Sequence, residues 1–388
     1  MKRKMKFPLL ARIVVAIILG VALAGFMPLE GVRLFVTFNG VFGQFLQFLI
    51  PLIIVGLITP AIADIGQGVG KLLLLTTLIA YVDTVCAGML SYGVGTLLFP
   101  KFISPASGMT TLPQGISLEP FFKINIPPIM DVMSALVLAF IMGMGIAYLQ
   151  KHTLKNVAEE FKDVVVATIK KVMIPLLPLY IFGLFLSMAY TGQAWHLISV
   201  FIAIIGIIFV LHILLLVAQY SVAGLIVRRN PFRLLWNMMP AYFTALGTSS
   251  SAATIPVTLQ QTEKNSVDPA IAGFTIPLCA TIHMSGSAMK ITACALALMI
   301  MQGYAFSGGL FLGFVMMLGV IMIAAPGVPG GSIMATLGIL ASMLGFNEND
   351  CALMIALYIA MDSFGTACNV TGDGAIALVI DTISKRKR

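Results

Sequence analysis

The sequence predicts an all-α membrane protein with eight transmembrane helices and two re-entrant helical hairpins. Hydrophobic residues make up 59% of the 388 residues and charged residues only 10%, too few charges for a soluble domain of this length. Crossing a hydrocarbon core of about 30 Å takes roughly 20 helical residues. Apolar runs of that order lie at 12–27, 34–63, 72–99, 127–149, 164–190, 197–227, 269–302 and 351–381.

The net charge of +8 is concentrated in short basic clusters that flank the apolar runs. These clusters are Met1–Lys6, Lys151–Lys162, Arg228-Arg229 and Ser384–Arg388. Basic flanks mark the cytoplasmic side, so both termini are expected there, which agrees with an even number of spans. The first apolar run is expected to be a retained helix, because no small-residue cleavage site and soluble domain follow it. We expect a multi-pass protein of the plasma membrane (the inner membrane in a bacterium), with the lipid bilayer and not nucleic acid as its partner.

Two interrupted apolar segments predict the re-entrant hairpins. Residues 240–256 and 321–335 each place a tip rich in Ser, Gly or Pro between apolar arms that are too short to span separately. Bare backbone at membrane depth is tolerated only where it lines a polar cavity. A long apolar run follows each segment, at 269–302 and 351–381, so a hairpin–helix unit occurs twice. Paired interrupted segments of this kind indicate a transporter binding site.

The last apolar run carries the most concentrated set of polar residues. Asp362, Thr366, Asn369 and Asp373 are spaced i, i+4, i+7 and i+11, so in a helix they share one face. A carboxylate at membrane depth is costly unless it meets a cation, a proton or water. This stripe indicates a protein that moves a polar solute together with ions.

Four segments carry a resemblance to a known family. They are the first hairpin tip Thr248–Pro256, the second tip Gly327–Gly331, the last-helix segment Asn369–Asp373 and, more weakly, Phe45–Leu52. With these residues in this order, essentially the whole chain resembles the dicarboxylate/amino acid:cation symporter family, the glutamate transporter superfamily. In its site chemistry the chain is most similar to the neutral amino acid branches.

The resemblance implies a homotrimer that works by an elevator motion. A static scaffold would consist of residues 1–71 (helices 1 and 2) and 101–195 (helices 4 and 5). A mobile transport domain would consist of residues 72–100 (helix 3) and 196–388 (helix 6, first hairpin, helix 7, second hairpin and helix 8). The second hairpin would act as the gate.

The resemblance also implies roles for individual residues. Asp362 would receive the α-ammonium group of the solute, and Ser250 and Ser251 would offer donors to its carboxylate. The rest of the solute pocket would comprise Ser287, Gly327, Val328, Pro329, Gly330, Gly365, Thr366 and Asn369. The coupling cation, with Na⁺ in first place and no other cofactor, would be held by Asn369 and Asp373 together with Cys279, Thr281, His283 and Met284, several of them through backbone carbonyls.

One departure from the family pattern concerns the substrate. Gly365 stands where members that carry acidic substrates place an arginine. Without a guanidinium, a second carboxylate on the solute has no bidentate partner. A neutral amino acid is therefore predicted, and the glycine is expected to leave room for a side chain larger than that of serine. A dicarboxylate or acidic amino acid bound in an unusual way is the alternative.

A second departure concerns the ions. Residues 283–287 read His-Met-Ser-Gly-Ser where the family usually has Asn-Met-Asp-Gly-Thr, so Ser285 replaces an acid. Lys290 follows inside the apolar run and needs a counter-charge or a water path. We expect Asp83 either to pair with Lys290 or to replace the missing acid. The lysine could stand in for one cation and His283 could titrate near neutral pH, so a proton-coupled or cation-independent exchanger is an alternative.

Other classes of function have less support. An intramembrane enzyme would have to use Asp362 and Asp373 as acid and base, but no nucleophile–base spacing or metal cluster accompanies them. An anion channel is indicated only by Lys290. His212 is expected to be a packed histidine with one hydrogen bond. We therefore predict a transporter and not an enzyme.

Overall fold

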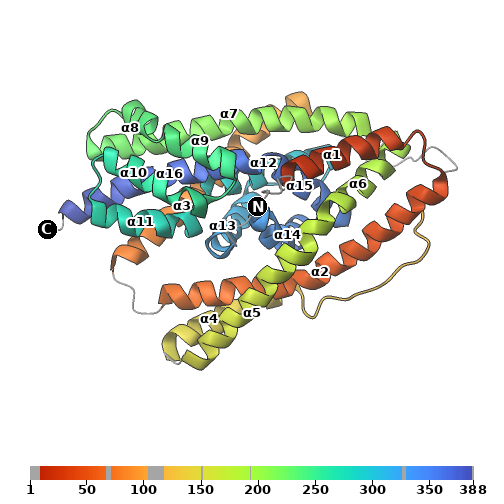
Figure 1. Ribbon diagram of the computed structural model, residues 1–388, viewed down its shortest axis with the longest axis horizontal. Coiled ribbons are helices and arrows are strands. Elements are labelled where there is room, and N and C mark those ends of the chain that lie inside the picture. Colours follow the sequence, from red (N-terminus) through yellow and green to blue (C-terminus); the bar gives the residue numbers. More distant parts are fainter. Residues whose placement is uncertain are drawn as a thin grey trace, which may run out of the picture.

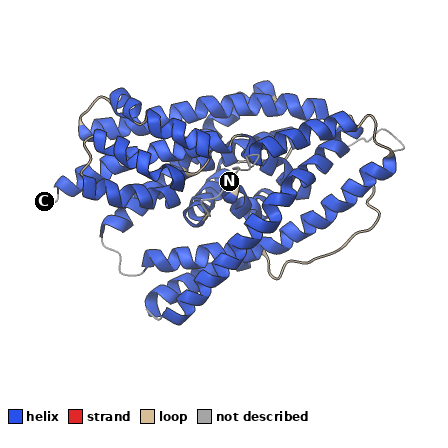
Figure 2. Cartoon of the chain, viewed as in Figure 1, coloured by secondary structure: helices blue, strands red, loops and turns tan. Residues whose placement is uncertain are grey.

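The computed structural model describes residues 9–66, 71–103, 118–149, 152–192, 194–325 and 329–386. Within these ranges every regular element is a helix (Figure 2), which confirms the all-helical class predicted from the sequence. Two of the predicted site residues, Gly327 and Val328, lie outside the described residues.

The first half of the chain forms long helices joined by connections of varied length. These are α1 (Leu9–Leu23), α2 (Leu29–Gly66), α3 (Lys71–Phe102), α4 (Val132–Leu149), α5 (His152–Thr168), a single π-helical turn η1 (Ile169–Met173) and α6 (Ile174–Tyr190). The α5–η1–α6 segment is continuous and spans His152–Tyr190.

The second half contains more helices, and most of them are shorter. These are α7 (Ala194–Val227), α8 (Pro231–Asn237), α9 (Met239–Thr248), α10 (Ser251–Lys264), α11 (Pro269–Ile282), α12 (Ser285–Gln302), α13 (Gly308–Ala324), α14 (Gly331–Leu344), α15 (Glu348–Ala360) and α16 (Asp362–Arg386).

Helices that could span a membrane occur in both halves of the chain. Six helical segments within the described ranges are long and apolar enough to cross a bilayer, and the bent pair α15–α16 would make a seventh. The helix α1 is apolar but has only 15 residues. The membrane class is supported, and the number of eight spans stays a prediction.

The helices pack in two groups (Figure 1). In one group α2 contacts α4, α5 and α6, and α1 packs along α6. In the other group α16 contacts α7, α9, α10, α11 and α12, and α3 packs along α12 and α13. The second hairpin joins the two, because its first arm, α13, contacts both α2 and α3.

Two runs that the sequence predicted as single long helices are interrupted. The run 269–302 is broken between α11 and α12, where His283 has an extended backbone and Met284 precedes the first turn of α12. The run 351–381 is broken at Met361, and α15 and α16 meet at an angle of 62°. Each break frees backbone N–H and C=O groups that an unbroken helix would pair. Both breaks lie beside predicted site residues.

Both predicted hairpins are present as pairs of short helices. In the first, Ser249 takes the left-handed conformation (φ 49°) between α9 and α10, and the Ser250 side chain then caps α10. In the second, Gly330 takes the left-handed conformation (φ 75°) at the start of α14. The arms have 10 and 14 residues in the first hairpin and 17 and 14 in the second, short of the roughly 20 needed to span.

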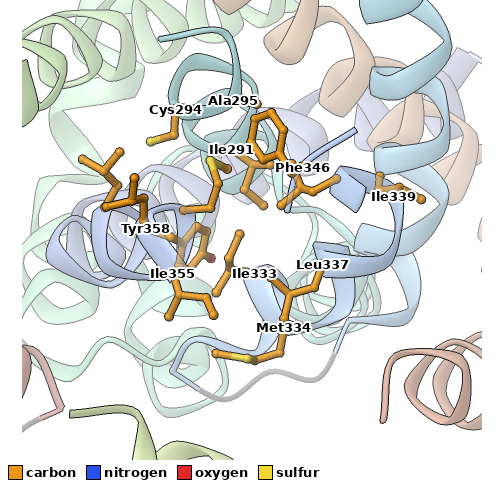
Figure 3. Close-up of a cluster of buried hydrophobic side chains, with 14 of the residues drawn as sticks. Ile291, Cys294, Ala295, Ile333, Met334, Leu337, Ile339, Phe346, Ile355 and Tyr358 are labelled. Carbon is orange, nitrogen blue, oxygen red and sulfur yellow. The ribbon is translucent and has the colours of Figure 1, made fainter. Parts of the chain in front are cut away.

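A dense apolar cluster supports the centre of the second half (Figure 3). Side chains of α12, α14 and α15 meet there, among them Ile291, Ile333 and Ile355, each completely buried. Every side chain of α12 from Ser285 to Met301 is buried. Tyr358 lies in this cluster, so α12 and α15 hold it in a fixed position beside the polar residues described next.

Candidate functional site

The polar stripe of α16 and both hairpins meet around one small cavity. Its volume is about 30 Å³, far below the roughly 300 Å³ at the lower end for small-molecule sites. It is lined by Ser249, Ser250, Ser251, Met284, Ser287, Ser332, Tyr358, Asp362, Thr366 and Asn369. The structure thus brings together six of the predicted solute-binding residues: Ser250, Ser251, Ser287, Asp362, Thr366 and Asn369.

The first hairpin tip is fixed to the start of α16. The Ser249 and Ser363 hydroxyl oxygens lie 2.6 Å apart. The Ser250 hydroxyl accepts a hydrogen bond from the backbone N–H of Ala253 at 3.3 Å, which places the N-terminus of α10 at the cavity. The free N–H groups and the dipole of a helix N-terminus favour an anionic group such as a carboxylate.

The second hairpin reaches the site through its backbone. The N–H of Gly330 donates to Asp362 Oδ2 at 3.1 Å. Ser332, in the first turn of α14, lines the cavity with its side chain 3.2 Å from the sulfur of Met284. Pro329 and Gly330 themselves are not among the lining residues. Their predicted role in solute binding stays a prediction.

The side chain of Lys290 forms an ion pair with Asp362. Its Nζ lies 3.5 Å from Asp362 Oδ1, 3.4 Å from the carbonyl oxygen of Met361 and 3.4 Å from the ring centroid of Tyr358. The lysine is completely buried in α12. The expected pairing of Lys290 with Asp83 is therefore wrong, because each of these residues has a different partner.

Gly365 makes room for this lysine. A Cβ atom at position 365 would lie 3.0 Å from Lys290 Nζ and 3.4 Å from Cε. The expectation that the glycine leaves room for a larger solute side chain is wrong, since the lysine already occupies that space. Gly365 also does not line the cavity.

Asn369 stabilises the broken start of α12. Its Oδ1 accepts from the N–H of Gly286 at 2.8 Å and of Ser287 at 3.2 Å, and its Nδ2 donates to the Ser287 hydroxyl at 3.1 Å. These are N–H groups that lack a partner within the helix. The amide thus holds α12 against α16 and positions Ser287 in the cavity.

Asp373 belongs to a second polar network, which is buried except at Asp83, whose side chain is 23% exposed. His283 Nδ1 lies 2.8 Å from Asp373 Oδ1, and its Nε2 lies 2.8 Å from Asp83 Oδ2. Gln219 of α7 donates to Asp83 Oδ2 at 2.6 Å and to the Ser285 hydroxyl at 3.0 Å. A neutral imidazole has one N–H, so both carboxylates receive a hydrogen bond only from the doubly protonated ring. Gln219 links Asp83 to Ser285, and the idea that Asp83 replaces the missing acid stays a prediction.

The predicted cation ligands are close in sequence but have separate partners. The Asn369 Oδ1 atom is bonded to α12 and the Asp373 Oδ1 atom lies against His283. Among the carbonyl candidates at the end of α11, Cys279 O accepts from the N–H of His283 at 2.9 Å. A cation at this place would have to displace these contacts, and the ligand set, which includes Thr281 and Met284, stays a prediction.

Sequence reasoning missed four residues that the structure places in or beside the site. Ser249, Ser332 and Tyr358 line the cavity, and the Tyr358 hydroxyl donates to Ser287 Oγ at 3.2 Å. Gln219 is the fourth, and its signal was an amide inside the apolar run 197–227. The expectation for His212 is confirmed: it is buried, and its Nε2 lies 3.0 Å from Gly286 O.

Comparison with known proteins agrees with the resemblance noted from the motifs. The model of the sodium:dicarboxylate symporter family matches residues 9–383. The chain is 26% identical to a serine/threonine transporter of Acinetobacter baumannii over 397 aligned positions, covering 98% of each protein. It is 36% identical over 164 residues to excitatory amino acid transporter 3 of the mouse, and this match covers 42% of the chain and 31% of the mouse protein. Because the family match extends over nearly all of its length, the chain belongs to the sodium:dicarboxylate symporter family.

Proposed function

We propose that the protein is a secondary active transporter that carries a neutral amino acid across the membrane together with a cation, with Na⁺ as the first candidate. The observation that carries this proposal is the buried carboxylate of Asp362, only 8% exposed, at a small polar cavity between the tips of two helical hairpins. A buried carboxylate is a natural partner for an ammonium group. The match to the serine/threonine transporter supports an amino acid as cargo.

The cavity has complementary groups for the two ends of an amino acid. Asp362 would take the α-ammonium group, and the hydroxyls and backbone N–H groups at Ser250 and Ser251 would take the carboxylate. Thr366 and Ser287 would face the solute side chain and favour a small or hydroxylated one. The buried ammonium of Lys290 is held behind Asp362 and does not line the cavity, so a second carboxylate has no cationic partner among the lining residues.

The two packing groups support an elevator mechanism. The group around α2, α4, α5 and α6 would be the scaffold, with predicted bounds 1–71 and 101–195. The group around α16, with α3 and α7–α12, would move with the second hairpin, with predicted bounds 72–100 and 196–388. A homotrimer, with both termini in the cytoplasm, would provide the fixed frame.

Transport that does not depend on Na⁺ is the second candidate. The observation in its favour is His283, whose two ring nitrogens lie 2.8 Å from Asp373 and Asp83. A protonated imidazole between two carboxylates would supply the positive charge that a bound Na⁺ would otherwise supply. Exchange of amino acids by the same fold would then need no cation gradient.

Uptake of labelled amino acids into proteoliposomes tests both candidates. With an inward Na⁺ gradient, we expect a neutral amino acid such as serine to accumulate above its external concentration, and glutamate to compete weakly. Replacing Na⁺ by choline at fixed pH should abolish accumulation if the first candidate is right. Undiminished uptake in choline would establish the second. Absence of binding and uptake for every amino acid tried would refute the proposal.

The role of Asp362 is tested by the neutral variant Asp362→Asn. Losing one charge-assisted hydrogen bond of about 1.5–3 kcal/mol should weaken amino acid binding roughly 10-fold to 100-fold. Thermal shift with increasing amino acid measures this, because a ligand that binds only the folded protein raises its melting temperature. Thr292→Val is a matched control, since Thr292 is buried in α12 and bonds only to Ala288 O among the described contacts. Unchanged affinity in Asp362→Asn would show that the ammonium group binds elsewhere.

A further inference from the structure

Lys290 has an unusual position for a lysine in a helix that crosses a membrane. Its side chain is completely buried where α12 packs against α15 and α16. A buried ammonium is very costly unless it is paired. The structure gives it three partners: the Asp362 carboxylate, the Met361 carbonyl and the face of the Tyr358 ring.

The Asp362 carboxylate is in turn satisfied by groups of the protein. Oδ1 faces Lys290 Nζ at 3.5 Å, and Oδ2 accepts from the N–H of Gly330 at 3.1 Å. One oxygen is therefore balanced by a tethered ammonium and the other is bonded to the tip of the second hairpin. An ammonium group of a solute that binds Asp362 has to replace or share one of these contacts.

We propose that Lys290 is a tethered ammonium that competes with the ammonium group of the solute for Asp362. In doing so it lets the second hairpin close onto Asp362 when no amino acid is bound. The proposal rests on the proposed function, because it takes Asp362 as the ammonium site. It makes Lys290 a positioning residue that acts through Asp362 and not by lining the cavity.

The geometry favours an exchangeable contact over a permanent one. At 3.5 Å the N–O distance exceeds the 2.7–2.9 Å of a strong charge-assisted hydrogen bond. The Tyr358 ring lies 3.4 Å from Nζ. It would keep a cation–π contact with the lysine when Asp362 binds the ammonium group of a solute. Gly365 provides the space for the ammonium, since a side chain there would meet Nζ.

Charge balance explains what the competition would do in the transport cycle. With Lys290 on Asp362 the closed site carries no net charge, so closing the hairpin does not bury an unpaired carboxylate. Without Lys290, closure in the absence of amino acid would leave Asp362 uncompensated and would be disfavoured. An amino acid ammonium takes over the same role when it binds.

Closure can be measured without any cargo through the accessibility of Ser332, which lines the cavity and is only 6% exposed. The probe is Ser332→Cys, labelled in membranes with a small charged thiol reagent in amino-acid-free buffer, with labelling of the parent chain subtracted. In this background we expect slow labelling, and at least 10-fold faster labelling when Lys290→Ala or Lys290→Gln is added. Thr292→Val, on the same helix, should leave the slow rate unchanged.

Chemical rescue separates a missing ammonium from general loosening of the fold. Propylammonium matches the part of the lysine side chain that Lys290→Ala removes, and n-propanol is its uncharged counterpart. We expect propylammonium to restore slow labelling in Lys290→Ala and propanol to have no effect, and Lys290→Arg to label more slowly than Lys290→Gln. Fast labelling of Lys290→Ala that propylammonium does not slow, or slow labelling of both neutral variants, would overturn the proposal.

The second measurement is the affinity of the Lys290→Gln variant for the transported amino acid. Together with the labelling experiment it separates this inference from the proposed function. Because Lys290→Gln removes the competitor, we expect it to bind the transported amino acid about 10-fold more tightly than the parent chain in the thermal-shift titration. Weaker or equal binding would contradict the competition. The labelling experiment needs no cargo, so a chain that binds no amino acid would refute the proposed function while the labelling result still decides whether Lys290 controls closure.

Discussion

The two buried carboxylates of α16 have contrasting surroundings. Asp362 and Asp373 lie 11 residues, about three helical turns, apart on one face of the helix. Each meets a basic side chain from the α11–α12 segment. At Asp362 this is Lys290 at 3.5 Å, and at Asp373 it is His283 at 2.8 Å.

The contacts beyond the first partner differ as well. The other oxygen of Asp362 bonds to a hairpin backbone, and its carboxylate lines a cavity. His283 continues from Asp373 to Asp83 and through Gln219 to Ser285, which joins α16, α3, α7 and α12 by short hydrogen bonds. At the Asp362 end the ion pair is long, at 3.5 Å, and the carboxylate lines a cavity. At the Asp373 end a hydrogen-bonded network, partly exposed at Asp83, joins four helices.

The difference in surroundings leads us to expect different roles for the two carboxylates. A carboxylate that has to release and accept a cargo is best paired weakly, whereas one that fixes the packing of several helices is best paired at short distance. We expect substitutions at Asp362 to act mainly on binding and those at Asp373 to act mainly on stability.

The largest expected effect is that of Asp373→Asn on stability. The change weakens a buried, short His–Asp contact, and breaking a buried pair costs about 3 kcal/mol or more of the free energy of unfolding. Asp362→Asn leaves the buried Lys290 ammonium without its carboxylate. We expect a smaller cost there, because the ion pair it removes is longer, at 3.5 Å, and the Tyr358 ring and the Met361 carbonyl remain as partners of the lysine. Unfolding in mild detergent, followed by tryptophan fluorescence or circular dichroism, compares the two variants.

The exposed residue Asp163 serves as control for that comparison, since Asp163→Asn should change the free energy of unfolding by less than about 0.5 kcal/mol. If Asp362→Asn were as destabilising as Asp373→Asn, the two ends of the stripe would be equivalent and the contrast would fail.

A smaller effect is expected from Gly365→Ala, which tests how closely Lys290 packs against Gly365. The added methyl group would lie 3.0 Å from Lys290 Nζ, so the ammonium would have to shift by a few tenths of an ångström. Because the lysine is fully buried and held by Asp362 and Tyr358, we expect a cost of about 1 kcal/mol, at the low end for overpacking. Gly206→Ala in α7 is the matched control, because no neighbouring atom lies within 4 Å of the added carbon. There the loss of glycine's backbone freedom should stabilise the helix by about 0.5–1 kcal/mol. Melting temperatures that move in opposite directions would support the model of a lysine packed against Gly365, and a stabilising Gly365→Ala would contradict it.

Much of the site follows from spacing along the sequence. The stripe Asp362, Thr366, Asn369 and Asp373 was predicted because helical periodicity fixes which residues share a face. The hairpins were predicted because helix-breaking tips between short apolar arms have few alternatives at membrane depth. Both features are local. Asp362, Thr366 and Asn369 of the stripe and residues of both hairpins line the cavity, whereas Asp373 does not.

The errors concern contacts between distant segments. The partner of Lys290 was misassigned because spacing says nothing about which helix lies opposite, and the bend at Met361 decides that Asp362 faces α12. The space at Gly365 was misjudged for the same reason, since a side chain 75 residues away in the sequence fills it. The His283–Asp83 contact joins residues 200 positions apart and depends on the break between α11 and α12.

The smallest effect is expected from Tyr358→Phe, which together with Tyr358→Leu tests whether the ring of Tyr358 or its hydroxyl group supports Lys290. Tyr358→Phe removes the hydrogen bond to Ser287 at 3.2 Å but keeps the ring under the ammonium, so we expect a loss of about 1 kcal/mol or less. Tyr358→Leu also removes the cation–π contact, which is worth about 2 kcal/mol when desolvated, and should cost correspondingly more. Unfolding measurements on both variants, repeated in chains that also carry Lys290→Gln, isolate the contribution of the contact between the ring and the lysine to the free energy of unfolding. If the difference between the Phe and Leu variants persists unchanged without the lysine, the ring contributes only packing. In that case the ring would not stabilise the Lys290 ammonium group when Asp362 binds a solute.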